Sequence, residues 1–261
     1  MCSHGRTVYL SAHLDDAALS CGGTIAQQSR RGEDPLVVTC FAGVPNYGQL
    51  SPFAIGQHEK WGMPADPVSS RRSEDVQAMA RLGAQYTHLD FPDCIYRRHE
   101  HSGEALYASE AALFGQVHPA EAHLVGKLVS QLQCMLPLAD VEIYAPLAIG
   151  NHVDHQLLLQ AALQLEAQGY HVRFFEDLPY AEEAEQLHRA LSGWTCKLVS
   201  RTTDLAESEL QIKTETIACY KSQLVGLFGT KAQMVNRVRA YALRVGCDGR
   251  YGERYWRVSK A

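Results

Sequence analysis

The sequence predicts an α/β fold in which a mostly parallel sheet is flanked by helices on both faces. Two observations predict it: short runs rich in β-branched and aromatic residues alternate with amphipathic helical segments, and this strand–helix alternation repeats four times. In such a sheet, ligands bind at the carboxyl ends of the strands, in the loops that lead into the helices. The candidate site should therefore be sought at that edge.

The expected elements follow one another in order. Strands are expected at 7–13, 36–41, 87–91, 141–145 and 172–175, and helices near 17–31, 71–83, 120–136 and 154–168. Segments 42–70 and 92–118 are long for loops, which usually span about 4–6 residues. Both follow expected strands, so they are expected to cover the ligand edge as lids or substrate loops, or else to be disordered insertions.

The C-terminal third continues without a break in composition. Residues from about 178 to 261 have mainly helical patterns, with a strand-like run at 197–200. No linker rich in Pro, Gly or Ser separates them from the rest of the chain. We therefore expect one domain over 1–261, with 178–261 as its mainly helical C-terminal part.

Composition excludes several classes of protein. The 261 residues are 46% hydrophobic and 20% charged with a formal net charge of −5, and the absence of a long basic run argues against nucleic acid or an anionic membrane surface as a partner. No apolar stretch approaches the roughly 20 residues of a membrane-spanning helix, and residues 1–12 lack the apolar core of a signal peptide. Eight cysteines without CxxC spacing favour free thiols. We expect a cytoplasmic protein with no transmembrane segment.

A first group of polar residues lies where the first expected strand ends. In "SAHLDDAALSCGG" (11–23), His13 is followed by Asp15 and Asp16 at the start of the next helix. One of the aspartates can cap that helix, since aspartate is a good N-cap residue. Capping accounts for only one carboxylate, however, and two adjacent carboxylates repel each other unless a cation lies between them. The glycine pair Gly22-Gly23 inside the helix predicts close packing of the helix on a strand.

A second group repeats this arrangement after the fourth expected strand. In "APLAIGNHVDHQ" (145–156), His152 and His155 are three residues apart, so a helical turn places them on one face. Taken with His13 and Asp16, either histidine completes a set of two imidazoles and one carboxylate, which zinc accepts at catalytic sites. The other histidine and Asp15 are then left for acid–base or electrostatic roles. A competing pair, His99 and His101, lies in a charged loop and is expected to be solvated.

The two motifs together resemble those of the zinc-dependent deacetylases related to N-acetylglucosaminyl-phosphatidylinositol de-N-acetylase (PIG-L), also called the LmbE-like family. The family signature is a His-Pro-Asp-Asp-Glu run near the N-terminus and a later His-x-x-His run, on a Rossmann-like sheet. Weaker similarity extends over "RRSED" (71–75), "RLGA" (81–84), "DFPDCIYR" (90–97), "EDLPYA" (176–181), "KTETIACYKSQ" (213–223) and "YGERYW" (251–256).

The resemblance implies a role for each matching residue. The zinc ligands would be His13, Asp16 and His155. Asp15 would be the base that deprotonates the attacking water, and His152 would stabilise the oxyanion. Arg71 and Asp93 would bind the substrate.

Two of these positions need a separate remark. A cation in the first turn of the helix expected at 71–83 faces the positive end of its dipole, so Arg71 is expected to have an anionic partner. A surface arginine paired with Glu74 or Asp75 is the alternative. Leu14 and Ala17 replace the proline and glutamate of the family signature, and a missing carboxylate near a metal site can alter its affinity or substrate range.

The expected function is hydrolysis of an N-acyl group, above all acetyl, from an amino sugar or sugar conjugate. Zinc is the expected metal, although iron or another divalent ion can compete in such a site. The expected partner is a small N-acylated sugar or conjugate, whose identity would depend on loop residues such as Tyr47, Trp61, Tyr96 and Arg97. The sequence leaves the oligomeric state open, a homo-oligomer included. Two other functions remain open: a non-catalytic binding protein of the same fold, and a nucleotide-binding enzyme. Against the second, the first strand–helix turn carries two carboxylates in place of G-x-G-x-x-G.

Overall fold

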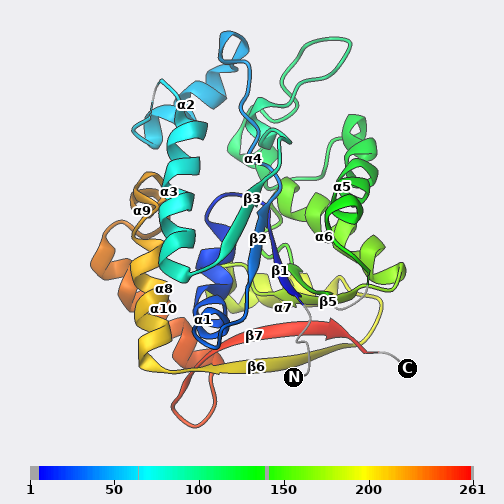
Figure 1. Ribbon diagram of the computed structural model, residues 1–261. Coiled ribbons are helices and arrows are strands. Elements are labelled where there is room, and N and C mark those ends of the chain that lie inside the picture. Colours follow the sequence, from blue (N-terminus) through cyan, green and yellow to red (C-terminus); the bar gives the residue numbers. More distant parts are fainter. Residues whose placement is uncertain (1–5, 64, 139–140, 260–261) are drawn as a thin grey trace.

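The computed structural model describes residues 6–63, 65–138 and 141–259, and these residues form a sheet of seven strands (Figure 1). The order across the sheet is β3-β2-β1-β4-β5-β7-β6, with β1 to β5 parallel and β7 antiparallel to both of its neighbours. The strands are β1 (Arg6–Ser11), β2 (Leu36–Thr39), β3 (Gln85–His88), β4 (Val141–Pro146), β5 (His171–Phe175), β6 (Leu198–Leu205) and β7 (Tyr251–Val258). The expected α/β fold with a mostly parallel sheet is confirmed.

Helices cover both faces of this sheet (Figure 1). Helices α1, α3 and α8 pack against one another on one side, and α5 packs against α6 on the other. The α-helices are α1 (Asp16–Arg30), α2 (Pro52–Lys60), α3 (Pro67–Leu82), α4 (Glu110–Leu113), α5 (Ala122–Met135), α6 (Val153–Ala167), α7 (Ala184–Ser192), α8 (Glu207–Ile217), α9 (Lys221–Phe228) and α10 (Lys231–Val245). The short 3-10 helices are η1 (Tyr47–Gln49), η2 (Cys94–Tyr96), η3 (Pro119–Glu121) and η4 (Tyr180–Glu182). Among the described residues, no helix is both long and apolar enough to cross a bilayer.

The two faces of β1 contribute to different parts of the core. Val8 and Leu10 belong to the apolar cluster that contains the buried residues of α5 and α6, whereas Tyr9 belongs to the cluster beneath α1 and α3. This alternation follows from the two-residue period of a strand. The central strands are buried on both faces because helices cover both, and they therefore read as nearly continuous apolar runs.

The strand order places a reversal of the chain next to the two sequence motifs. After β1, the chain adds β2 and β3 on one side, then crosses back to place β4 on the other side of β1. At such a reversal, the loops that leave the two central strands diverge and open a crevice at their carboxyl ends. The loops after β1 and β4 carry the two motifs, so this topology brings them to one place.

The expected loops contain more structure than the sequence indicates. Segment 42–70 holds η1, α2 and the first residues of α3, and segment 92–118 holds η2 and α4. Helix α3 begins at Pro67, four residues before the expected start, because Asp66 caps it by accepting a hydrogen bond from the amide of Ser69 (3.1 Å).

The C-terminal part differs from the expectation in its strands. It contains the four helices α7 to α10, and the strand-like run 197–200 lies at the start of β6, but β7 was not expected to be a strand. The sequence of β7 lacks the apolar pattern of a core strand, because the charged residue Glu253 occupies one of its buried positions. A charged residue is rarely buried unless it is paired, and Glu253 is paired with the buried Lys213 of α8 (2.6 Å).

The glycine pair of α1 allows close packing of this helix, as expected, and the elements that pack against it are β6 and α8. A Cβ at Gly23 would lie 2.4 Å from Leu205 Cδ1, at the end of β6, and one at Gly22 would lie 3.1 Å from Lys213 Cγ of α8. Helix α1 therefore packs closely on a strand, as expected, and that strand is β6 of the C-terminal part of the chain.

Candidate metal centre and active site

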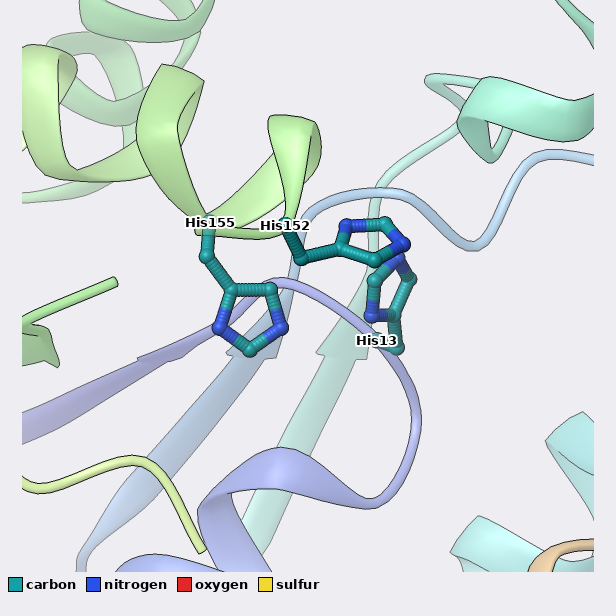
Figure 2. Close-up of side chains that lie close together, drawn as sticks. All are labelled: His13, His152 and His155. Carbon is teal, nitrogen blue, oxygen red and sulfur yellow. The ribbon is translucent and has the colours of Figure 1, made fainter. Parts of the chain in front are cut away.

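Three histidines from the two motifs lie side by side (Figure 2). His13 comes from the turn after β1, and His152 and His155 come from the start of α6. The ring centroid of His13 lies 4.8 Å from that of His152 and 5.3 Å from that of His155, and the centroids of the last two are 5.5 Å apart. The nitrogens of the three rings lie close enough together to hold one metal ion.

Asp16 lies between His13 and His155. Its Oδ2 is 3.5 Å from Nδ1 of His13 and 3.3 Å from Nε2 of His155, and it also accepts a hydrogen bond from the amide of His13 (2.7 Å). Ligands about 2.0–2.2 Å from a tetrahedral zinc ion must lie roughly 3.3–3.5 Å from one another. The two measured separations therefore match those of ligands around a common ion.

Two further carboxylates fix the orientation of these rings. Nε2 of His13 lies 3.0 Å from Oδ2 of Asp154, and Nδ1 of His155 lies 2.7 Å from Oδ1 of Asp177. One nitrogen of each ring thus faces Asp154 or Asp177, and the other nitrogen faces Asp16. With a metal bound, the proton of each ring would stay on the nitrogen that faces Asp154 or Asp177, and the nitrogen that faces Asp16 would be the ligand. Metal-binding histidines are commonly oriented in this way.

Sequence reasoning did not assign Asp154 or Asp177. The available signals were the position of Asp154 between the two histidines of "HVDH" and that of Asp177 in "EDLPYA". Neither signal identifies the ring that the carboxylate contacts, because the partners are distant in sequence. His13 and Asp154 are 141 positions apart, and His155 and Asp177 are 22 positions apart.

The surrounding carboxylates favour positive charge at the two rings. Burial acts to lower the pKa of His155, but the Asp16 carboxylate beside it outweighs this effect and raises the pKa to about 10. For His13, hydrogen bonds to Asp154 and Asp16 likewise overcome burial and raise the pKa well above its usual value. A site that stabilises protons on both rings can exchange them for a divalent cation, since metals and protons compete for the same nitrogens.

Asp15 stands at the N-cap position of α1 but does not act as its cap. Its side chain makes no capping hydrogen bond, and its Oδ1 faces Nη2 of Arg71 at 3.6 Å. Burial, and then the charge of Asp16, raise the pKa of Asp15 to about 6, while Arg71 acts in the opposite direction. A divalent cation nearby would also lower this pKa. The helix-capping alternative thus does not account for this carboxylate.

His152 is the residue that does cap its helix. Its Nδ1 accepts a hydrogen bond from the amide of Asp154 (3.2 Å), so the proton of the neutral ring is on Nε2. Burial, and then the neighbouring His13, hold the pKa of His152 well below its usual value, which keeps the ring neutral. His152 can therefore present an N–H donor to a group in the site.

Arg71 lies in the second turn of α3 rather than the first, so the helix dipole does not explain its position. It is buried, and its guanidinium lies over the ring of Trp61, 4.7 Å from the centroid. The alternative of a surface arginine paired with Glu74 or Asp75 is wrong, because Glu74 bonds Ser222 and Asp75 bonds His88 and Tyr220.

Asp93 uses its two oxygens differently. Its Oδ1 accepts a hydrogen bond from the amide of Ile95 (3.1 Å) and thereby caps η2, whereas Oδ2 faces Nε2 of His13 at 3.8 Å. The side chain lies at the edge of the same site.

One cavity of about 300 Å³ is lined by the sequence-predicted site residues His13, Asp15, Asp16, Arg71, Asp93, His152 and His155. Its walls also include residues in or directly after α2 and α4, and residues of η4 and α9: Gln57, Lys60, Trp61, Glu110, Leu113, Phe114, Tyr180, Ser222, Gln223, Gly226 and Leu227. Of the four loop residues considered for substrate contact, only Trp61 lines it, and Tyr47, Tyr96 and Arg97 do not. His99 and His101 also lie outside the lining, and His101 is exposed, as expected.

The two departures from the family signature are both buried. Leu14 is 5% exposed, and Ala17 is 1% exposed within the apolar cluster beneath α1. The amide of Ala17 donates to Ser11 Oγ (3.0 Å). Neither residue lines the cavity that is described above.

Comparison with known proteins agrees with this arrangement. Residues 8–166 match the model of the GlcNAc-PI de-N-acetylase family. A 2'-N-acetylparomamine deacetylase of Niallia circulans is 34% identical over 242 residues, covering 87% of this chain and 83% of the relative. A second one, of Streptomyces fradiae, is 31% identical and covers 69% of this chain and 60% of the relative.

The fold of a solved structure matches over nearly the whole length. The zinc-inhibited form of a teicoplanin deacetylase superposes with a TM-score of 0.84 at 30% identity, covering 98% of each chain. The sequence motifs, the sheet order and these relatives lead to one conclusion. The chain belongs to the GlcNAc-PI de-N-acetylase family, and it is a deacetylase.

Proposed function

We propose that the chain is a zinc-dependent hydrolase that removes an acetyl group from the amine of an amino sugar or sugar conjugate. One observation carries the proposal: His13 and His155 each bond a carboxylate with one nitrogen and face Asp16 with the other. The relatives named as deacetylases favour an enzyme over a non-catalytic binding protein.

The donor set fits the expected metal. His13, Asp16 and His155 would hold it as a borderline N/N/O set, which zinc accepts and for which iron or cobalt can compete. When bound, the metal supplies Lewis acidity, which polarises the amide carbonyl and makes water a better nucleophile near neutral pH.

Asp15 and His152 would perform the proton transfer and the charge stabilisation. Asp15 is next to the ligand Asp16 and has no capping bond, so it is free to take a proton from the attacking water and return it to the leaving amine. His152 would donate its Nε2–H to the carbonyl oxygen as negative charge develops there.

The substrate class follows from the cavity and from the relatives. The 2'-N-acetylparomamine deacetylases act on an N-acetylated amino sugar compound, as their names state. In this chain Arg71, Asp93 and Glu110 supply both signs of charge to a cavity that also has aromatic walls. Such a lining suits a sugar, whose hydroxyls accept and donate hydrogen bonds and whose ring packs on aromatic faces.

The proposal is tested with the purified protein loaded with zinc. Acetate release should be measured on 2'-N-acetylparomamine, N-acetylglucosamine and N,N'-diacetylchitobiose, with metal content determined on the same sample. We expect zinc-dependent release of one acetate per cleaved amide from at least one of them. A metal-loaded, folded protein that releases no acetate from a broad panel of N-acetylated sugars would contradict the proposal.

Replacing His152 by Ala should lower kcat without removing the metal. Loss of one donor to a developing oxyanion costs about 10²–10³-fold in kcat. Metal content and kcat should be measured on one preparation. If His152→Ala instead lost zinc while keeping the turnover of its remaining loaded fraction, His152 would be a ligand and not the oxyanion donor.

Replacing Arg71 by Met should weaken substrate binding. Hydrogen bonds to charged groups contribute about 1.5–3 kcal/mol, so kcat/KM should fall by roughly 10–100-fold. The loss of substrate contact should raise KM. Because Arg71 also lowers the pKa of Asp15, the acidic limb of the kcat profile should move to higher pH. Arg72→Met is the matched control, because Arg72 instead contacts the Ala42 carbonyl and Asp90. Equal kinetics for the two variants would exclude substrate contact by Arg71.

A further inference from the structure

Asp154 connects a candidate metal ligand to a buried arginine. The carboxylate is fully buried. Its Oδ2 contacts Nε2 of His13 (3.0 Å) and accepts a hydrogen bond from the amide of Cys94 (3.1 Å), and its Oδ1 pairs with Nη1 of Arg97 (2.5 Å). One carboxylate thus lies between the imidazole of His13 and the guanidinium of Arg97.

The guanidinium of Arg97 is held in one orientation. It pairs with Glu121 through Nε and Nη2, and Nη1 donates to the carbonyl of Pro92 (3.2 Å). Its Cζ also lies over two aromatic rings, 5.1 Å from the centroid of Phe41 and 5.5 Å from that of Tyr107. Arg97 is 6% exposed and does not line the cavity, so these contacts are internal.

We propose that Arg97 is a positioning residue for the metal centre, acting through Asp154 to set the orientation of His13. The inference rests on the proposed function, because it takes His13 as a metal ligand. Asp154 Oδ2 faces Nε2 of His13, and Nδ1 of the same ring faces Asp16. The contacts of Asp154 with Arg97 Nη1 and with the amide of Cys94 hold the carboxylate in this position. Without the guanidinium, one oxygen of a fully buried carboxylate loses its partner, and the side chain can turn away from His13.

The same contacts tie the segment after β3 to the metal centre. Arg97 follows η2 and Glu121 ends η3, and Glu121 also accepts a hydrogen bond from the hydroxyl of Tyr107 (2.6 Å). The segment that contributes Asp93, Glu110 and Phe114 to the cavity is therefore anchored on the carboxylate that orients His13. Metal affinity should accordingly depend on a residue of this segment that touches neither metal nor substrate.

The experiment measures zinc affinity and not turnover. Arg97→Met, Asp154→Asn and the double variant are titrated with zinc against a chromophoric chelator at fixed pH. Loss of a group that orients a ligand typically costs about 10–100-fold in metal affinity, and we expect this loss for Arg97→Met. Arg98→Met is the matched control with unchanged affinity, because Arg98 donates to the backbone carbonyls of Gln49 and Gly103.

The double variant distinguishes positioning from a general loss of stability. If Arg97 acts through Asp154, Arg97→Met should weaken zinc binding no further once Asp154 is Asn. Losses that add in the double variant would overturn the proposal, and so would full zinc affinity in Arg97→Met with a native circular dichroism spectrum.

A second variant covers the case in which Arg97→Met does not fold. Arg97→Lys retains a positive charge but cannot contact Asp154 and Glu121 together. We expect several-fold weaker zinc binding from it, and unchanged affinity would count against the proposal. All of these titrations are independent of acetate release, so a failure of the proposed deacetylation would be recognised separately.

Discussion

Asp15→Asn is expected to lower kcat by about 10²–10⁴-fold, the usual contribution of a general acid–base residue, while zinc remains bound. The amide of Asn has nearly the shape of the carboxylate but cannot take the proton of the attacking water. Asp16 and the two histidines are unchanged in this variant, so the ligand set stays complete. The measurement is kcat from acetate release, with zinc content determined on the same protein.

A matched control separates this effect from a general loss of charge. Asp34→Asn removes an exposed carboxylate just before β2, at the opposite edge of the sheet from the cavity, and kcat should not change. Asp15 would not be the base if Asp15→Asn kept the turnover of the unmodified protein on every substrate that is cleaved.

His13→Ala is expected to remove both zinc and activity. The variant loses one of the three candidate ligands and also leaves the buried Asp154 without the imidazole that it contacts. Its loss of zinc affinity should therefore exceed the about 10–100-fold that follows from loss of an orienting partner alone. The measurement is the zinc dissociation constant by chelator competition, together with residual acetate release at saturating zinc.

His101→Ala serves as the control for His13→Ala. His101 is exposed in the segment after β3 and outside the cavity, so both zinc affinity and activity should be retained. Asp15→Asn and His13→Ala should lose activity for different reasons. Asp15→Asn loses turnover while zinc stays bound, whereas His13→Ala loses the zinc itself. Full zinc occupancy in His13→Ala would show that the metal is held elsewhere, for example by a set that includes His152.

Much of the fold could be predicted because its signals are local. Strands β1, β2, β4 and β5 begin within one residue of their expected starts, and α1, α5 and α6 begin within two. Strand β3 lies at Gln85–His88, whereas the strand was expected at 87–91, because its exposed and half-buried positions carry no apolar run. Helix α3 and strand β7 were misjudged for physical reasons. The cap at Asp66 and Pro67 moved the start of α3, and the buried pair of Glu253 and Lys213 gave β7 a charged core position.

The sequence by itself determined which chemical groups are available: the imidazoles of His13, His152 and His155 and the carboxylates of Asp15 and Asp16, each just beyond a strand. The tertiary structure decided how they are oriented. Asp177 bonds His155, Arg71 faces Asp15, and Arg97 holds Asp154 against His13. Local patterns arise from backbone periodicity and capping, which involve neighbouring residues. Orientation depends on hydrogen bonds between residues that only the folded chain brings together.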